Sequence, residues 1–164
     1  MAQADSARQS EPNAKPDPDL RVRTALDRAA SGITGKFEQQ PEVEASIRNT
    51  IGQTYLGLGL YKESRRSWTV ALELRRRVLG SEHPNSLETL ASIGLLTRSE
   101  GKYAQAEALD SKTLEAQRRV LGPEHPSTLT SMMSLADDYR FQGKYAGSLG
   151  LPRLLSQPIT GRSV

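Results

Sequence analysis

The sequence contains no cysteine among its 164 residues. It therefore cannot form a disulfide, a thiolate zinc site or an iron–sulfur cluster, and it lacks a cysteine nucleophile. His83 and His125 are its two histidines and the remaining candidates for acid–base chemistry near neutral pH. We expect no cofactor and no bound metal ion.

Aromatic residues and long apolar runs are also scarce. Phe, Trp and Tyr make up 5% of the chain, which favours a thin, layered architecture over a thick globular core. No stretch approaches the roughly 20 apolar residues that a membrane span requires, and residues 1–20 lack the pattern of a secretory signal. We expect a cytoplasmic protein without membrane contact, with residues 1–18 as a disordered leader.

Charge of one sign is not in large excess. The 22 Lys and Arg against 19 Asp and Glu give a net charge of +3, so nucleic-acid binding would depend on local clustering. Arginines do cluster at 65–66, 75–77 and 118–119, but without interleaved aromatic residues on which bases could stack. We expect a solvated outer face here and keep nucleic-acid binding as a weaker alternative.

An internal repeat organises the chain. Residues 79–84 read LGSEHP and residues 121–126 read LGPEHP, so the second copy follows the first by 42 positions. The Gly-x-Tyr motifs at 59–61, 101–103 and 143–145 keep the same spacing. Because these features share one phase, we expect a tandem array of 42-residue units.

Each unit has the pattern of two amphipathic helices. Between Pro84 and Gly101, apolar residues recur at intervals of three and four, as along one face of a helix. Asn85 and Glu88 have the spacing of a capping box at its start. A second amphipathic pattern covers residues 103–121, so each unit is expected to be an antiparallel helical hairpin.

Small residues recur where the two helices of a hairpin would cross. Gly52, Gly94 and Ala136 share one repeat position in the first helix, and Ala71 and Ala106 lie in the second. Glycine inside a helix costs about 1 kcal/mol relative to alanine. We therefore expect these positions to let the two helix axes approach closely.

These residues resemble a tetratricopeptide repeat, which pairs a small residue with Tyr in the first helix, as at Gly52 and Tyr55. The 42-residue period and the LGxEHPxxL joint are similar to the kinesin-light-chain-like branch, common in bacterial multi-repeat proteins. Residues 41–79 also resemble the repeat tail of some bacterial serine/threonine kinases. The resemblance implies an all-α, right-handed solenoid of antiparallel helical hairpins in a bacterial protein.

The repeat phase divides the chain into units. We expect repeat 1 over 44–85, repeat 2 over 86–127 and the first helix of an incomplete repeat 3 over 128–146. Before them, residues 19–43 are expected to form a capping helix and linker.

The capping helix has two interpretations. Val22, Leu26 and Ala29 precede the repeat-1 residues Ser64, Trp68 and Ala71 by 42 positions. The helix is then a half-repeat, equivalent to a second helix. The alternative is an amphipathic helix unrelated to the repeat.

The repeat pattern stops after Tyr145. Two glycines and one proline within residues 147–152 cost roughly 5 kcal/mol in helix propensity. We expect residues 147–164 to be irregular or disordered, as in a truncated or frame-shifted member, with an irregular lid as the alternative.

The incomplete third unit would expose part of its first helix. Without a second helix, Leu129, Met132, Leu135 and Tyr139 lose their usual cover. Self-association through residues 128–142 would bury this apolar stripe.

The resemblance also implies a concave groove lined by the first helices. Transferred by the repeat, its partner-binding residues are Asn49, Gln53, Leu56, Ala91, Leu95, Arg98, Met133, Asp137 and Arg140. Relatives usually carry a peptide-gripping Asn where this chain has Thr50, Ser92 and Ser134, which disfavours an extended-peptide mode. We expect Arg98 and Arg140, one repeat apart, to favour a protein or peptide partner with acidic residues, with ordinary surface charges as the alternative.

No catalytic signature is present in the sequence. It lacks a phosphate-binding Gly-rich loop, a GxSxG elbow and the HRD and DFG motifs of kinases. His83 and His125 both precede Pro in the joint between units, where a role in the turn is expected. We therefore expect a non-catalytic protein–protein interaction scaffold, the alternative being a regulatory repeat fragment of a bacterial kinase-like protein.

Overall fold

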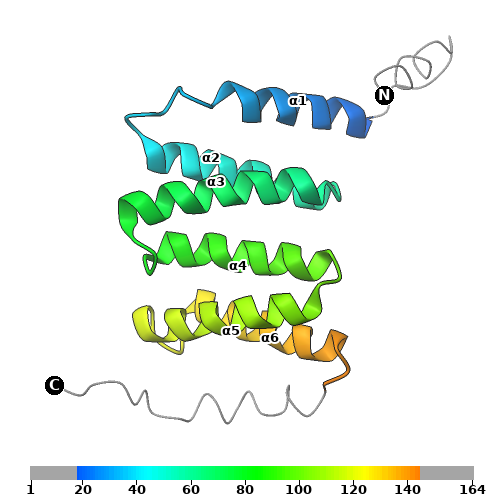
Figure 1. Ribbon diagram of the computed structural model, residues 1–164, viewed down its shortest axis with the longest axis vertical. Helices are drawn as coiled ribbons and strands as arrows, with labels where there is room; N and C mark the ends of the chain where they lie inside the picture. The colour runs from blue at the N-terminus through cyan, green and yellow to red at the C-terminus, as the bar shows by residue number, and fades with distance from the viewer. Residues whose placement is uncertain (1–17, 145–164) are drawn as a thin grey trace, which may run out of the picture.

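The structure, a computed structural model, describes residues 18–144 and contains helices but no strand over that range. The helices are α1 (Pro18–Gly32), α2 (Pro41–Gly57), α3 (Tyr61–Leu79), α4 (Pro84–Ser99), α5 (Tyr103–Val120) and α6 (Pro126–Phe141). Figure 1 shows them stacked in chain order, from α1 at the top to α5 and α6 at the bottom. The prediction of an all-α solenoid of helical hairpins is confirmed. Of the predicted leader, residues 1–18, only Pro18 is described, as the first residue of α1, and the predictions for everything after Lys144 also lie outside the described range.

The loops repeat as regularly as the helices. Gly59, Gly101 and Gly143 each follow the first helix of a hairpin and have φ of 71°, 77° and 71°. Gly80 and Gly122, in the joints between hairpins, have φ of 97° and 91°. A side chain would strain these left-handed conformations. The backbone therefore requires glycine at these positions, which explains why glycine recurs every 42 residues. Within residues 18–144, no helix is long and apolar enough to cross a bilayer.

The histidine of each joint starts the following helix. The Nδ1 atom of His83 accepts a hydrogen bond from the Asn85 N–H at 3.2 Å, and His125 does the same for Ser127. Pro follows each His as the first helical residue, where its missing N–H costs nothing. The expected capping box of Asn85 and Glu88 is wrong, because Asn85 lies inside the helix and donates through its side chain to Glu42 at 3.0 Å.

The small residues do bring the hairpin helices together. A Cβ on Gly52 would lie 2.8 Å from the ring of Trp68, and a Cβ on Gly94 would lie 1.8 Å from an oxygen of Asp110. Ala71 in α3 and Ala106 in α5 are fully buried. The prediction that these positions permit close approach is confirmed.

Helix α1 covers α2. The face of α1 that contacts α2 differs from the face that the 42-residue repeat predicts to be buried. Ile33 joins Ile51 and Tyr55 in a buried cluster, and Leu26 packs against it. The Tyr55 hydroxyl also donates to Asp27 at 2.6 Å. Of the three residues matched to the buried positions of α3, only Leu26 faces the core, whereas Val22 and Ala29 are exposed. The burial pattern of α1 therefore does not match that of α3, as the half-repeat interpretation would require.

Helix α6 packs on α5 through part of the stripe that was expected to lose its cover. Met132 and Leu135 are buried against Leu114, with Tyr139 beside them. Their predicted exposure is wrong, because these residues pack against α5. The large apolar side chains of α6 that are exposed are Leu129 (47%), Met133 (71%) and Phe141 (50%), and Phe141 stacks on Tyr103.

Candidate functional site

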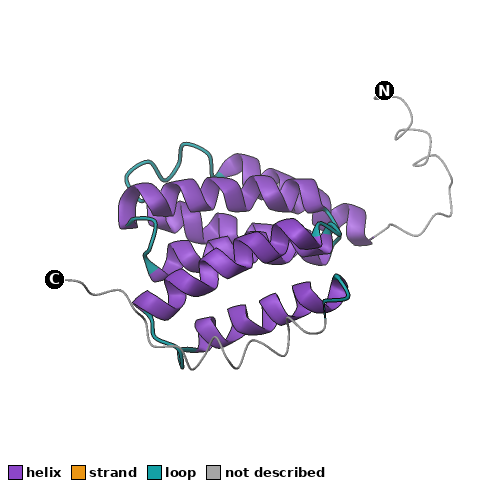
Figure 2. Cartoon of the chain, turned by 60° about the horizontal axis from the view of Figure 1, so that its bottom comes forward, coloured by secondary structure: helices purple, strands orange, loops and turns teal. Residues whose placement is uncertain are grey.

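The first helices of the hairpins share one face of the solenoid. Helix α4 contacts both α2 and α6, its counterparts in the neighbouring hairpins. The second helices α3 and α5 pack against them from the other layer. Figure 2 shows these helices joined by short loops, so side chains on α4 and α6 are held on rigid elements.

A cavity of about 330 Å³ lies between α4 and α6 on this face. Its lining combines apolar, hydroxyl and amide side chains with one acid: Glu88, Ala91, Ser92, Leu95, Gln117, Pro126, Ser127, Thr130, Ser131 and Ser134. Gln117 comes from α5, is 1% exposed, and its Oε1 atom has no hydrogen-bond partner. None of these lining residues carries a positive charge.

Two of the nine predicted groove residues line this cavity, namely Ala91 and Leu95. On α2, Gln53 is exposed, while Asn49 and Leu56 are half-buried. The remaining four lie outside the cavity lining: Arg98 is buried, Asp137 half-buried, and Met133 and Arg140 exposed. The cavity therefore brings together Ala91 and Leu95 but none of the other predicted groove residues.

Arg98 does not present its charge to a partner. Its side chain is 9% exposed, and Nη1 lies 3.2 Å from Asp138 and 3.8 Å from Asp110. It also donates to the backbone carbonyl of Ser134. The expectation of an exposed Arg98–Arg140 pair that favours acidic partners is wrong, because Arg98 neutralises acids of its own chain.

Arg140 is exposed but is also engaged within α6. Its Nη2 donates to Asp137 at 2.9 Å, and its guanidinium lies 4.8 Å from the centre of the Phe141 ring. Both members of the ion pair are about half exposed, so the pair contributes little to stability.

Two buried carboxylates accompany Arg98. Asp110 is 2% exposed and Asp138 is fully buried. Burial, and then the charge of Asp138, raise the pKa of Asp110 to about 7, against the opposing effect of Arg98. Burial raises the pKa of Asp138 as well. With one guanidinium for two acids, the pair favours holding a proton as the pH falls below about 7.

Sequence reasoning missed this buried cluster although a signal was present. Asp110 lies 42 positions after Trp68, the large aromatic residue that fills the first hairpin. A carboxylate where the repeat places a core aromatic indicates a buried charge with a partner nearby.

The histidines are structural in the described chain. His83 and His125 cap helices through Nδ1. Among residues 18–144, no group of three or more His, Asp or Glu side chains could hold a metal ion.

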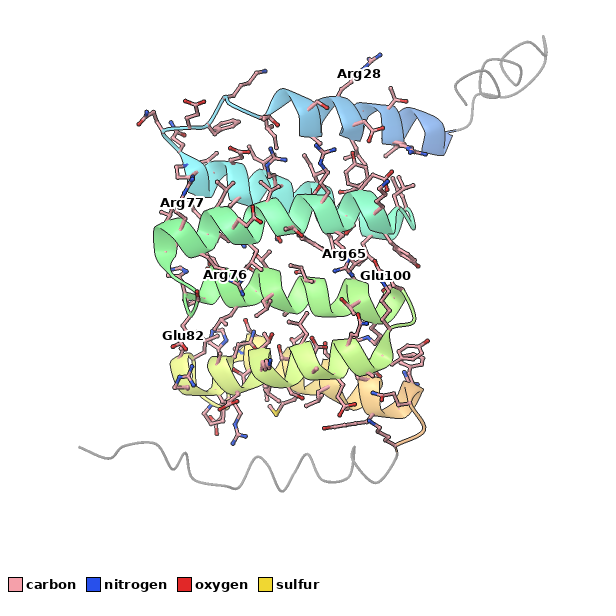
Figure 3. The ribbon with its side chains drawn as sticks, in the orientation of Figure 1. Arg28, Arg65, Arg76, Arg77, Glu82 and Glu100 are labelled. Atoms are coloured by element: carbon pink, nitrogen blue, oxygen red, sulfur yellow. The ribbon has the colours of Figure 1, made fainter. Side chains whose placement is uncertain are left out.

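The arginine runs connect successive hairpins. Figure 3 labels Arg65 on α3 and Glu100 at the end of α4, which point toward one another. Arg65 donates to Glu100 twice, at 3.2 and 3.0 Å, and Arg119 on α5 donates to Glu82 in the joint between α3 and α4. Arg75 is buried. Several of these cations are therefore already paired within the chain, which weakens the case for a nucleic-acid surface.

Comparison with known proteins places this architecture in a family. A model described as tetratricopeptide repeat matches residues 43–109 and 90–150, which is more than half of the chain. The chain belongs to the tetratricopeptide repeat family. Tetratricopeptide repeats generally mediate protein–protein interactions, and no curated protein matches the sequence.

Solved structures of kinesin-light-chain-like repeats share the fold of this tetratricopeptide repeat protein. A putative kinesin light chain from Podosopora anserina with nearly identical TPR-like repeats superposes with a TM-score of 0.69 at 19% identity, and a single-substitution variant of that protein with 0.70 at 19%. Each match covers 84% of this chain, which spans 65% of those chains. BtubC (BKLC) from P. vanneervenii gives 0.66 at 17% identity, covering 98% of this chain and 75% of its own. The likeness to kinase repeat tails stays a prediction.

Proposed function

We propose that this chain is a non-catalytic scaffold that binds a segment of a partner protein on the concave face of α2, α4 and α6. The cavity between α4 and α6 is the observation that carries this proposal. It offers an apolar wall, Ala91 and Leu95, beside several hydroxyl groups, as a peptide segment with mixed side chains requires.

The rigidity of this face also supports binding. The lining side chains come from helices whose spacing is fixed by buried contacts, including Leu96 of α4 and Thr128 of α6, both fully buried. A preformed surface loses little conformational entropy when a partner binds.

A charge placed in the cavity tests the proposal. Leu95→Lys puts a cation in the groove, and Val120→Lys puts the same charge on α5, where Val120 is about as exposed. In affinity purification followed by mass spectrometry, we expect proteins retained by the unmodified chain and by Val120→Lys to be lost from Leu95→Lys. Equal retention by both variants would reject the concave face as the binding surface.

Self-association through residues 128–142 is a second part of the proposal. Leu129, Met133 and Phe141 are exposed apolar side chains of this stretch that two copies could bury against each other. We expect the molecular mass from sedimentation to rise with concentration, and Met133→Glu to prevent the rise. A monomer mass at every concentration would remove this part and leave the groove proposal intact.

A further inference from the structure

The space between neighbouring first helices is filled differently in the two repeats. Between α2 and α4 it holds the guanidinium of Arg75, which is 4% exposed. The residue 42 positions later, at the α4–α6 space, is Gln117. The shorter, uncharged side chain lies beside the 330 Å³ cavity described above.

Arg75 of α3 is held by acceptors on two helices, α2 and α4. Its Nη1 donates to the Asn85 carbonyl at 3.0 Å and to Thr89 Oγ1 at 2.7 Å, and its Nη2 donates to Ser46 Oγ at 3.3 Å. Glu42 lies 3.4 Å from Nε and supplies the opposing charge. The first space is thus a closed guanidinium site occupied from within the chain.

The repeat places equivalents of these acceptors around the empty cavity. Ser46, Asn85 and Thr89 correspond, 42 positions later, to Glu88, Ser127 and Ser131, and all three of the latter line it. The second space therefore keeps three of the acceptor positions of the first and lacks its cation, while the position of Glu42 is taken by Pro84. At Glu88 it also gains a carboxylate, 59% exposed, where the first space has a hydroxyl.

The lining groups are suited to accept hydrogen bonds. The Ser92 hydroxyl donates to the Glu88 carbonyl at 3.1 Å and that of Thr130 to the Pro126 carbonyl at 3.0 Å, which leaves their lone pairs as acceptors. The Oε1 atom of the buried Gln117 is unpaired. A ligand rich in donors satisfies such groups, and an acceptor-rich anion does not.

The charges near the cavity favour a cation. Glu88 is the charged group in its lining, and it lies 3.9 Å from Arg75 Nη1 at the adjoining site. Arg98 approaches from the side of Ser134, but Asp110 and Asp138 offset its charge. At 330 Å³ the cavity far exceeds the roughly 10–15 Å³ that one water needs, so a side chain can enter.

We propose that the cavity between α4 and α6 is a socket for a guanidinium group, supplied by an arginine side chain of the partner segment. This inference rests on the proposed concave-face function and names the chemistry of its partner. Guanidinium is planar, with five donors in a fixed fork, and so reaches several acceptors at once. Arginine is preferred over lysine for that reason.

A small probe tests the socket without a known partner. The full chain is titrated with N-acetyl-argininamide and followed by amide NMR, with the uncharged N-acetyl-citrullinamide as the matched control. We expect saturable shifts at Glu88, Gln117 and Ser131 with the arginine probe and their loss with the citrulline probe. Equal shifts from both probes, or no shifts around the cavity, would overturn the inference.

Filling the socket from within gives the complementary test. Gln117→Arg restores the residue type of Arg75, and we expect it to fold, to raise the melting temperature and to abolish the shifts caused by N-acetyl-argininamide. Gln105→Arg is the control, because it makes the same substitution at an exposed site on α5. Persistence of the shifts in Gln117→Arg contradicts the socket. Glu88→Gln, which keeps the shape of the side chain, is expected to weaken the binding of the probe.

Failure of the socket and failure of the concave face give different results. Partners lost from Leu95→Lys, together with no specific probe binding, overturn the socket and keep the proposed function. If both groove variants retain the partners, the concave face is rejected as a protein-binding surface. Partners lost from Gln117→Arg and kept by Gln105→Arg support both.

Discussion

Trp68 and Asp110 occupy the same place in successive repeats, each against a glycine of the opposite helix. The Trp68 ring closes on Gly52, and its Nε1 donates to the Asn49 carbonyl at 3.1 Å. Asp110 closes on Gly94 in the same way but brings a buried carboxylate that faces Arg98. One backbone arrangement therefore encloses an aromatic ring in the first hairpin and a titratable group in the second.

The raised pKa of Asp110 makes stability depend on pH. Its pKa of about 7 in the folded protein exceeds the ordinary 3.8, so the folded state binds more protons than the unfolded state between these values. This contribution to stability is fully present below the lower value and is lost as pH rises toward 7. Urea unfolding is expected to show that Asp110→Asn loses less stability than the unmodified chain between about pH 5.5 and about pH 8.

Asp137→Asn is the control for that pH dependence, because Asp137 is half-buried and lies beside the cluster on α6. It should retain the pH dependence of the unmodified chain. Identical slopes for all three proteins would mean that Asp110 does not titrate in this range.

Gly52 should not tolerate alanine. The new Cβ would lie 2.8 Å from the ring of Trp68, which is fully buried and cannot withdraw easily. We expect Gly52→Ala to lower the free energy of unfolding by about 1–3 kcal/mol despite alanine's better helix propensity. Gly57→Ala, in the same helix with no atom within 4 Å, should be neutral or stabilising in the same denaturation experiment. A stabilised Gly52→Ala would refute the close approach.

Arg98 and Arg140 share a repeat position but should differ in their effect on stability. Arg98→Met leaves Asp110 and Asp138 buried without a cation, a change that typically costs about 3–5 kcal/mol. Arg140→Met removes an exposed pair and should cost less than about 1 kcal/mol. Chemical denaturation at neutral pH measures both, and similar losses would argue against a structural role for Arg98.

The 42-residue period predicted the helices and turns because backbone requirements repeat. The glycines at positive φ, the His-Pro joints and the small residues at the helix crossings all recur with it. Side-chain partners could not be obtained in this way. The 42-residue phase placed Arg98 in the groove. In the structure Arg98 pairs instead with Asp110 of α5 and Asp138 of α6. Asp110 departs from the repeat, so the period could not predict this pairing.

The cavity was missed for a related reason. The period predicts that Gln117 matches Arg75, yet only the three-dimensional contacts of Arg75 show what the substitution leaves unfilled. Positions where the residue type differs between repeats are candidates for function, and the structure shows which chemical groups surround them.

Site-specific photocrosslinking tests the central claim, that the concave face binds a protein partner, most directly. A benzophenone amino acid is placed at Leu95 on α4, or at Val120 on α5 as the control, since both native side chains are partly exposed. The account predicts discrete crosslinked proteins from position 95, reduced in Gln117→Arg, and none from position 120. Crosslinks from position 120 with none from position 95 would contradict it.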